Sequence, residues 1–153
     1  MELPEGREWD MLVFDVDGTI LDAEGMIPET ITLVRELEKK GMTVSLASGR
    51  TLPNLTPIHQ SLAISGFIVG ENGGIVWDSY QGHPIKALAD GSRTREAAQW
   101  LGTQIEGLNA AGIESNRWRE TEWCLIGVGD WEAEAACQVD RAPRSARLLH
   151  PRL

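Results

Sequence analysis

The chain has 153 residues, of which 42% are hydrophobic and 24% are charged, and its formal net charge is −9 at pH 7. This length fits one domain, or one small core that carries an insertion. The acidic balance and the lack of a basic stripe argue against a nucleic-acid partner. The first ten residues lack the apolar core of a signal peptide and no apolar run reaches membrane-spanning length, so we expect a cytoplasmic protein without a membrane partner.

The first predicted element is an apolar run that ends on two carboxylates. Leu12, Val13 and Phe14 predict a buried parallel strand covered on both faces, because apolar residues follow one another without alternation. Asp15 and Asp17 come at its C-terminal end, where open α/β sheets bind ligands. Two acids this close predict a magnesium site or an acid/base couple, and a carboxylate can also attack phosphorus. An Asp-rich turn is the purely structural alternative.

Residues 14–21, Phe-Asp-Val-Asp-Gly-Thr-Ile-Leu, resemble the first motif of the haloacid dehalogenase (HAD) superfamily of phosphatases and phosphotransferases. The resemblance implies that Asp15 attacks the phosphoryl group and that Asp17 acts as general acid and base. It further implies that Asp15 and the backbone carbonyl of Asp17 bind Mg²⁺, and that Thr19 helps to position this loop.

The next two elements complete a βαβ unit. The amphipathic stretch from Glu29 to Lys40 predicts a crossover helix, with Pro28 in its first turn. Residues 42–47 predict the second strand, and a right-handed crossover places its end beside Asp15. The serine hydroxyl, glycine amide and helix start that follow this strand can bind phosphate oxygens.

Residues 47–51, Ala-Ser-Gly-Arg-Thr, resemble the second motif of the superfamily. The resemblance implies that Ser48 binds the transferring phosphoryl group, and we include Gly49 and Arg50 as candidates for phosphate or substrate binding. Arg50 has two open interpretations, since it could contact the substrate or pair with a nearby acid.

The third strand and its turn come next. Residues 52–63 predict a second crossover helix, interrupted early by Pro53 and Pro57. Residues 67–70 predict a short strand, and Asn-Gly before the apolar run 75–77 is typical of a hairpin. Residues 70–74 also resemble the loop after the third strand in superfamily members with an α/β cap, which makes Asn72 a substrate-side candidate.

A polar stretch from residue 78 to residue 89 predicts the boundary between core and cap. Residues 93–108 then predict a cap helix, whose apolar positions at helical spacing predict core residues: Ala97, Trp100, Leu101 and Ile105. Arg117 and Arg119 alternate around Trp118, so on a strand both guanidinium groups face one side. Such a pair is an anion clamp or a solvated face. Residues 116–121 resemble a cap segment of the archaeal-type phosphoglycolate phosphatases, which use magnesium to remove phosphate from 2-phosphoglycolate.

The third-motif lysine and the fourth-motif acids of the superfamily are not found. Lys86 precedes the cap instead of following it, and Gly129-Asp130 with Glu134 only imitates the fourth motif. Residues 131–139 predict a second cap helix with Asp130 as its N-cap. Residues 141–153 hold arginines and prolines without a clear period and predict a tail, disordered or produced by truncation or frameshift.

Together, these observations predict an α/β fold: a Rossmann-like HAD core with a parallel sheet in three α/β/α layers, an inserted α+β cap and a C-terminal truncation. Residues 1–80 are expected to form the first part of the core, 81–140 a partial cap and 141–153 the tail. The resemblance implies a Mg²⁺-dependent phosphomonoester hydrolase that acts through an aspartyl-phosphate on a small phosphorylated metabolite, 2-phosphoglycolate first. Two alternatives stay open. One is a weak or inactive relative that serves as a binding or oligomerisation module, including a homodimer, and the other is a sugar phosphotransferase or phosphomutase.

Overall fold

The computed structural model describes residues 9–78 and 85–127. These residues form two compact units: residues 9–78, 85–91 and 117–122 make up the first, and residues 92–116 and 123–127 the second. The predicted second cap helix at 131–139, with Asp130, and the predicted tail at 141–153 lie outside the described residues. The predicted division at residue 80 stays a prediction, because residues 79–84 also lie outside them.

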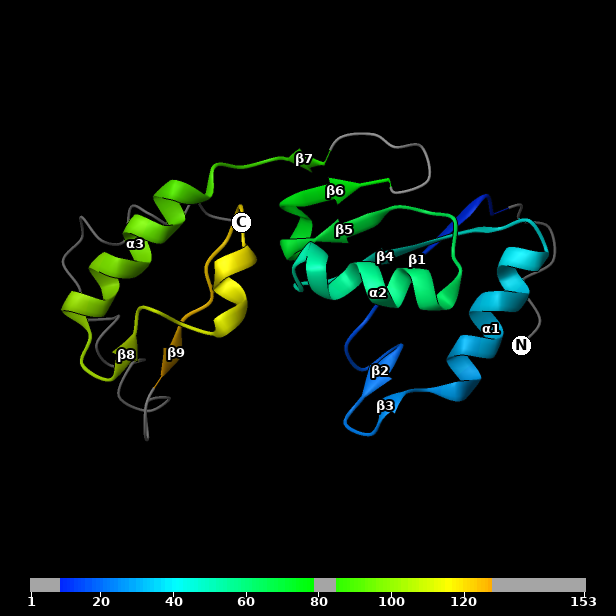
Figure 1. Cartoon of the computed structure of the whole chain (residues 1–153), viewed down its shortest axis with the longest axis horizontal. Coiled ribbons are helices and arrows are strands. Elements are labelled where there is room, and N and C mark those ends of the chain that lie inside the picture. The colour runs from blue at the N-terminus through cyan, green and yellow to red at the C-terminus, as the bar shows by residue number, and fades with distance from the viewer. Residues whose placement is uncertain (1–8, 79–84, 128–153) are drawn as a thin grey trace. The chain divides into compact units, whose positions relative to one another are not determined.

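The first unit is built on a five-stranded sheet in the order β1-β4-β5-β6-β7 (Figure 1). Three strands run parallel: β1 (Met11–Asp15), β4 (Thr43–Ala47) and β5 (Ile68–Gly70). Two join the sheet antiparallel: β6 (Ile75–Trp77) and β7 (Lys86–Ala87). Asp15 pairs with Ala47, and Ala47 pairs with Val69, so the carboxyl ends of the three parallel strands lie side by side.

Two helices connect the parallel strands, as predicted. α1 (Pro28–Lys39) follows a short hairpin made of β2 (Leu21–Asp22) and β3 (Gly25–Met26), and α2 (Leu52–Leu62) joins β4 to β5. The predicted early interruption of the second helix is wrong. Pro53 lies in the first turn, where its missing N–H is not needed, and α2 continues through the exposed Pro57 at the loss of one intrahelical hydrogen bond.

The core of the first unit lies between these helices and one face of the sheet. It is formed by apolar side chains that include Val34, Leu37, Val44, Leu46, Leu55, Ile58, Leu62 and Ile68, with Leu12 and Phe14 packed against them. Met11 and Val13 point away and are 44% and 54% exposed. The α/β class is therefore confirmed, but the expectation that the first strand is covered on both faces is wrong within the described residues, which supply one helical layer.

The second unit contains α3 (Gly91–Gln104) and a two-stranded antiparallel pair, β8 (Leu108–Asn109) and β9 (Ile126–Gly127). A helix is confirmed at this position, although it spans Gly91–Gln104 instead of residues 93–108, and its assignment to a cap stays a prediction. The predicted stripe of core residues is only partly right. Ile105 is buried as predicted, but Trp100 is 37% exposed, and Ala98, which the prediction did not include, is buried. Within the described ranges, no helix combines the length and the apolar character that a membrane crossing requires.

The predicted strand around the two arginines is wrong. Residues Glu114–Trp118 form a short 3₁₀ helix, η2, which contains Arg117 and ends before Arg119. Arg117 is exposed, whereas Arg119 is buried. The two guanidinium groups therefore lie in different environments and do not form one face.

One substitution should stabilise the first unit at the end of α2. Ala63 has left-handed backbone angles, φ 55° and ψ 43°, which cost a side-chain-bearing residue about 1 kcal/mol. Ala63→Gly removes this strain but adds unfolded-state entropy, so we expect a net gain of about 0.5 kcal/mol in the free energy of unfolding. Urea denaturation measures it. Ala23→Gly, in an exposed turn without a positive φ, is the control, and equal gains in both variants would contradict the explanation.

Candidate active site

The two predicted carboxylates lie at the carboxyl edge of the sheet. Asp15 ends β1, and its Oδ1 accepts a hydrogen bond from the Val16 amide at 2.8 Å. Gly18 turns the chain with φ 80°, a conformation that favours glycine, and its amide donates to the Leu21 carbonyl. The Asp15 and Asp17 side chains are both exposed, so both can meet a ligand.

The second predicted loop follows β4 and meets the first loop through an ion pair. The Arg50 guanidinium binds Asp17 with two nitrogens: Nη2 lies 2.7 Å from Oδ1 and Nε lies 3.0 Å from Oδ2. Hydrogen bonding by this guanidinium lowers the pKa of the Asp17 carboxyl, against a smaller opposing effect of burial, and the same contact raises the pKa of Arg50. Of the two interpretations left open for Arg50, the structure therefore shows pairing with an acid.

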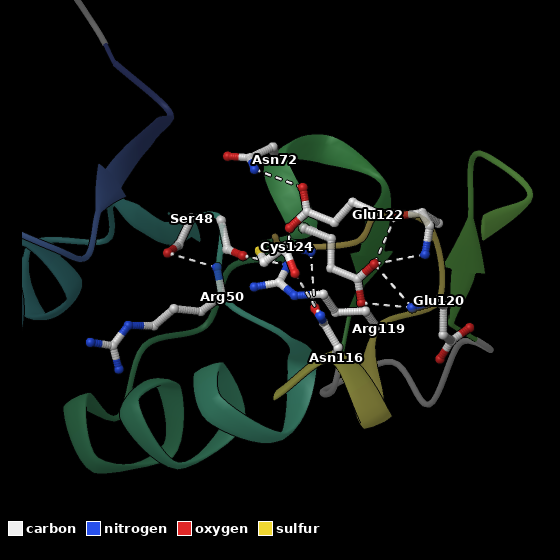
Figure 2. Close-up of polar contacts among 11 residues, drawn as sticks. Ser48, Arg50, Asn72, Asn116, Arg119, Glu120, Glu122 and Cys124 are labelled. Atoms are coloured by element: carbon white, nitrogen blue, oxygen red, sulfur yellow. Dashed lines mark hydrogen bonds and ion pairs between the residues drawn. The ribbon is translucent and has the colours of Figure 1, made fainter. Parts of the chain in front are cut away.

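The loop after β4 has its carbonyl groups engaged by other parts of the first unit. The Ser48 carbonyl accepts from the Asn72 amide at 3.2 Å, the Gly49 carbonyl from Arg119 Nη1 at 3.0 Å, and the Arg50 carbonyl from the Glu71 amide at 3.0 Å. Ser48 Oγ accepts from the Arg50 amide at 3.2 Å, and Figure 2 shows this contact. Within the described part of the chain, the Gly49 amide has no hydrogen-bond partner.

The loop after β5 contains a buried acid that the sequence did not single out. Glu71 is 3% exposed and starts the single-turn 3₁₀ helix η1 (Glu71–Gly73) with φ 52°. Its carboxylate accepts from the Glu120 amide at 3.1 Å, and from the Thr121 amide and hydroxyl at 2.8 Å each. Glu71 therefore ties residues 117–122 to the edge of the sheet, about fifty positions away in sequence.

Asn72, the predicted substrate-side residue, lies over the loop after β4. A Cβ atom built on Gly49 would lie 3.0 Å from Asn72 Oδ1, so the Asn72 side chain packs closely against Gly49 and a larger residue there would require it to shift. Asn72 Nδ2 donates to Glu122 Oε2 at 2.8 Å, and Arg119 forms an ion pair with the same Glu122 (Figure 2). Sequence reasoning missed Glu71 and Glu122, because nothing local marks an acid as the partner of a distant segment.

Thr19 is the predicted site residue that the structure connects least to the others. It is half-buried, and its carbonyl accepts from Thr30 Oγ1 at 3.2 Å. Within the described residues it makes no hydrogen bond to another predicted site residue. Within the first loop its amide donates to the Val16 carbonyl at 3.3 Å, and its predicted positioning role stays a prediction.

The donor set suits a hard cation only in part. Asp15 supplies carboxylate oxygens and Asp17 the backbone carbonyl that the resemblance implies, and a hard divalent ion is often held by one or two carboxylates with waters and a substrate phosphate. Among residues 9–78 and 85–127, no three metal-binding side chains converge. The Asp15 carboxylate thus fits such an ion chemically, and waters and a substrate phosphate would supply further ligands.

A pocket of about 610 Å³ lies in the first unit, and neither Asp15 nor Asp17 lines it. Its lining comes from α2, Glu71, β6, Ile85 and residues 117–120, and it combines apolar side chains with charged ones that include Arg119. Two of the lining residues, Glu71 and Arg119, also contact the loop after β4.

Comparison with known proteins agrees with this arrangement. The profile of the haloacid dehalogenase-like hydrolases matches residues 12–117, and the chain therefore belongs to this family. The crystal structure of a Thermoplasma acidophilum protein is similar, with a TM-score of 0.74, 27% sequence identity and coverage of 88% of this chain and 58% of that one.

Relatives carry several phosphatase names. The phosphoglycolate phosphatase of Thermoplasma acidophilum is 36% identical over 111 residues, covering 72% of this chain and 47% of the relative. That of Picrophilus torridus is 34% identical over 122 residues, covering 78% and 48%. A Bacillus subtilis 5-amino-6-(5-phospho-D-ribitylamino)uracil phosphatase is 39% identical over 70 residues, covering 45% and 28%. The chain spans about half the length of the phosphoglycolate phosphatases that it matches.

Proposed function

We propose that the chain hydrolyses small phosphate monoesters, 2-phosphoglycolate first, in a Mg²⁺-dependent reaction. The observation that carries this proposal is the meeting of two loops at one sheet edge: the Asp15–Asp17 loop after β1 and the Ser48–Arg50 loop after β4. The β1–β4 register and the Asp17–Arg50 ion pair bring them together. Carboxylates beside a serine hydroxyl and an unoccupied amide are the groups that phosphoryl transfer needs.

In the proposed reaction, an Asp15 oxygen attacks phosphorus and forms an aspartyl-phosphate while the ester P–O bond breaks. The leaving oxygen takes a proton from the Asp17 carboxyl group, which must be protonated for this step although the ion pair with Arg50 lowers its pKa. Water then attacks phosphorus, Asp17 takes the proton from that water, and the bond between Asp15 and phosphorus breaks to release phosphate. Ser48 and the Gly49 amide hold the phosphoryl oxygens throughout.

The proposed cofactor is Mg²⁺, held by Asp15 and by Asp17. Bound there, Mg²⁺ would neutralise charge on the phosphoryl oxygens. The protein's own part is to present the two exposed carboxylates at the end of β1 and to keep Arg50 next to them.

The proposed substrate is supported by the names of relatives. The Thermoplasma acidophilum and Picrophilus torridus proteins that match more than two thirds of this chain are phosphoglycolate phosphatases. The Bacillus subtilis relative carries a different substrate name but matches less than half of the chain. These matches favour a small phosphorylated acid over the larger phosphoribitylaminouracil.

The test is phosphate release from 2-phosphoglycolate by the purified chain, with Mg²⁺ and after its removal with EDTA. We expect release to fall by about 100-fold or more without the ion, because charge stabilisation of this kind contributes several kcal/mol. Restoring Mg²⁺ should restore the rate, and Ca²⁺ at the same concentration serves as the matched control. Release that is unchanged by EDTA would contradict the metal dependence.

A second candidate function is a binding or oligomerisation module. The observation that favours it is a set of exposed apolar side chains at β1 and beside β5: Trp9, Met11, Val13 and Phe67 are each more than 40% exposed. Parallel sheets are usually covered on both faces, so such a surface can bind another polypeptide. A well-folded chain that releases no phosphate under any of these conditions would favour this second function.

A further inference from the structure

We infer that Arg119 is a positioning residue: it holds the Gly49 carbonyl and so fixes the loop whose Gly49 amide faces the phosphoryl group. The inference rests on the proposed function, because it assumes that the Ser48–Arg50 loop binds phosphate. It assigns a role to a residue that lies 70 positions away in the sequence and outside the two sequence motifs of the site.

The first step of the argument concerns the two peptide groups that flank Gly49. In a trans peptide the C=O and N–H groups point in opposite directions. The Ser48 carbonyl points to the Asn72 amide, so the Gly49 N–H in the same peptide group points away from Asn72. The Gly49 carbonyl points to Arg119, so the Arg50 N–H points the other way, toward Ser48 Oγ.

The second step concerns the freedom of Gly49. A glycine loses more conformational freedom on ordering than any other residue, and a loop centred on it needs anchors on both sides. Asn72 anchors the preceding peptide group and Arg119 anchors the following one. Without Arg119 the peptide group that directly follows Gly49 loses its partner, and the next contact from outside the loop is the Glu71 amide on the Arg50 carbonyl. The unbonded Gly49 amide is then less well preorganised for an anion.

The third step concerns how Arg119 itself is held. Its side chain is 5% exposed and forms an ion pair with Glu122, which in turn accepts from Asn72 Nδ2 (Figure 2). Glu71 binds the next two residues of the same segment through their backbone amides. Arg119 Nη1 thus contacts both the Gly49 carbonyl and the Glu122 carboxylate. A buried side chain held in this way can order the loop by holding the Gly49 carbonyl group.

The test uses the full chain labelled with ¹⁵N and inorganic phosphate as the probe. Phosphate should shift the Gly49 amide resonance of the wild-type chain in a saturable way that gives a Kd. Arg119→Ala should weaken this Kd by about 10-fold, the loss of one good hydrogen bond. Arg117→Ala is the matched control, because Arg117 is an exposed arginine on the same segment whose guanidinium packs over the Trp118 ring. Its Kd should stay within about 2-fold of the wild type.

A second variant separates positioning from folding. Arg119→Lys keeps the positive charge and one donor group but loses the planar fork, so its Kd should lie between those of the wild type and Arg119→Ala. In turnover of 2-phosphoglycolate, the change should appear mainly in KM, because the Gly49 amide holds the phosphoryl group before and during reaction.

The outcomes distinguish this inference from the proposed function. Equal phosphate affinity in the wild type and in Arg119→Ala overturns the inference, even if the enzyme turns over. No phosphate-induced shift of Gly49 in the wild type overturns it as well. A 10-fold loss in Arg119→Ala, in a chain that binds phosphate but hydrolyses nothing, supports the inference and refutes the proposed hydrolase.

Discussion

Asp15→Asn is expected to reduce kcat for 2-phosphoglycolate by about 10⁴-fold or more, because an amide oxygen cannot serve as the nucleophile that forms the acyl phosphate. The side chain keeps its size, and its oxygen can still accept from the Val16 amide. The fold should therefore be unchanged, and the effect should be confined to chemistry. Colorimetric phosphate release under saturating substrate measures it.

The control for this substitution is Asp22→Asn in the β2–β3 hairpin. Asp22 is also an exposed aspartate whose Oδ1 accepts backbone amides, from Glu24 at 2.8 Å and from Gly25 at 3.1 Å. It lies outside the proposed site, so its kcat should stay near that of the wild type. If Asp15→Asn kept more than a tenth of the wild-type rate, Asp15 would not be the nucleophile.

Much of the parallel part of the fold could be predicted because its signals are local. Apolar runs of strand length, a proline at the start of α1 and a glycine after it set the βαβ order. Right-handed crossover then brings the ends of β1 and β4 together, and the structure confirms this by pairing Asp15 with Ala47. The carboxylates and Ser48 could be placed at one edge for that reason alone.

The parts that could not be predicted depend on distant partners. Val13 resembles a core residue in sequence, but its exposure is decided by what covers that face of the sheet. Residues 114–121 alternate like a strand, yet Glu71 binds two consecutive amides of this segment and Arg119 reaches the Gly49 carbonyl. These long-range hydrogen bonds select a compact conformation over an extended one, and periodicity carries no information about them.

Because long-range hydrogen bonds to Glu71 attach residues 117–122, Glu71 is the residue whose loss should loosen the site most. Glu71→Ala removes a buried acceptor for the Glu120 amide and for the Thr121 amide and hydroxyl, at a cost of about 3 kcal/mol for the attachment of residues 117–122. Alanine would carry the same unfavourable positive φ as glutamate, so the comparison isolates the carboxylate. We expect amide hydrogen exchange at Glu120 and Thr121 to accelerate by about 100-fold, the factor that this energy implies.

The control for Glu71→Ala comes from the segment that Glu71 holds. Glu120 has an exposed side chain without a hydrogen bond in the described part of the chain, and it takes part only through its backbone amide. Glu120→Ala removes one carboxylate but keeps that amide, so exchange at Thr121 should stay within about 2-fold of the wild type. If exchange at Thr121 were equally slow in Glu71→Ala and Glu120→Ala, the carboxylate would not be what holds the segment. A fast-exchanging segment in Glu71→Ala should also weaken phosphate binding, because Arg119 can hold the Gly49 carbonyl only while residues 117–122 stay attached.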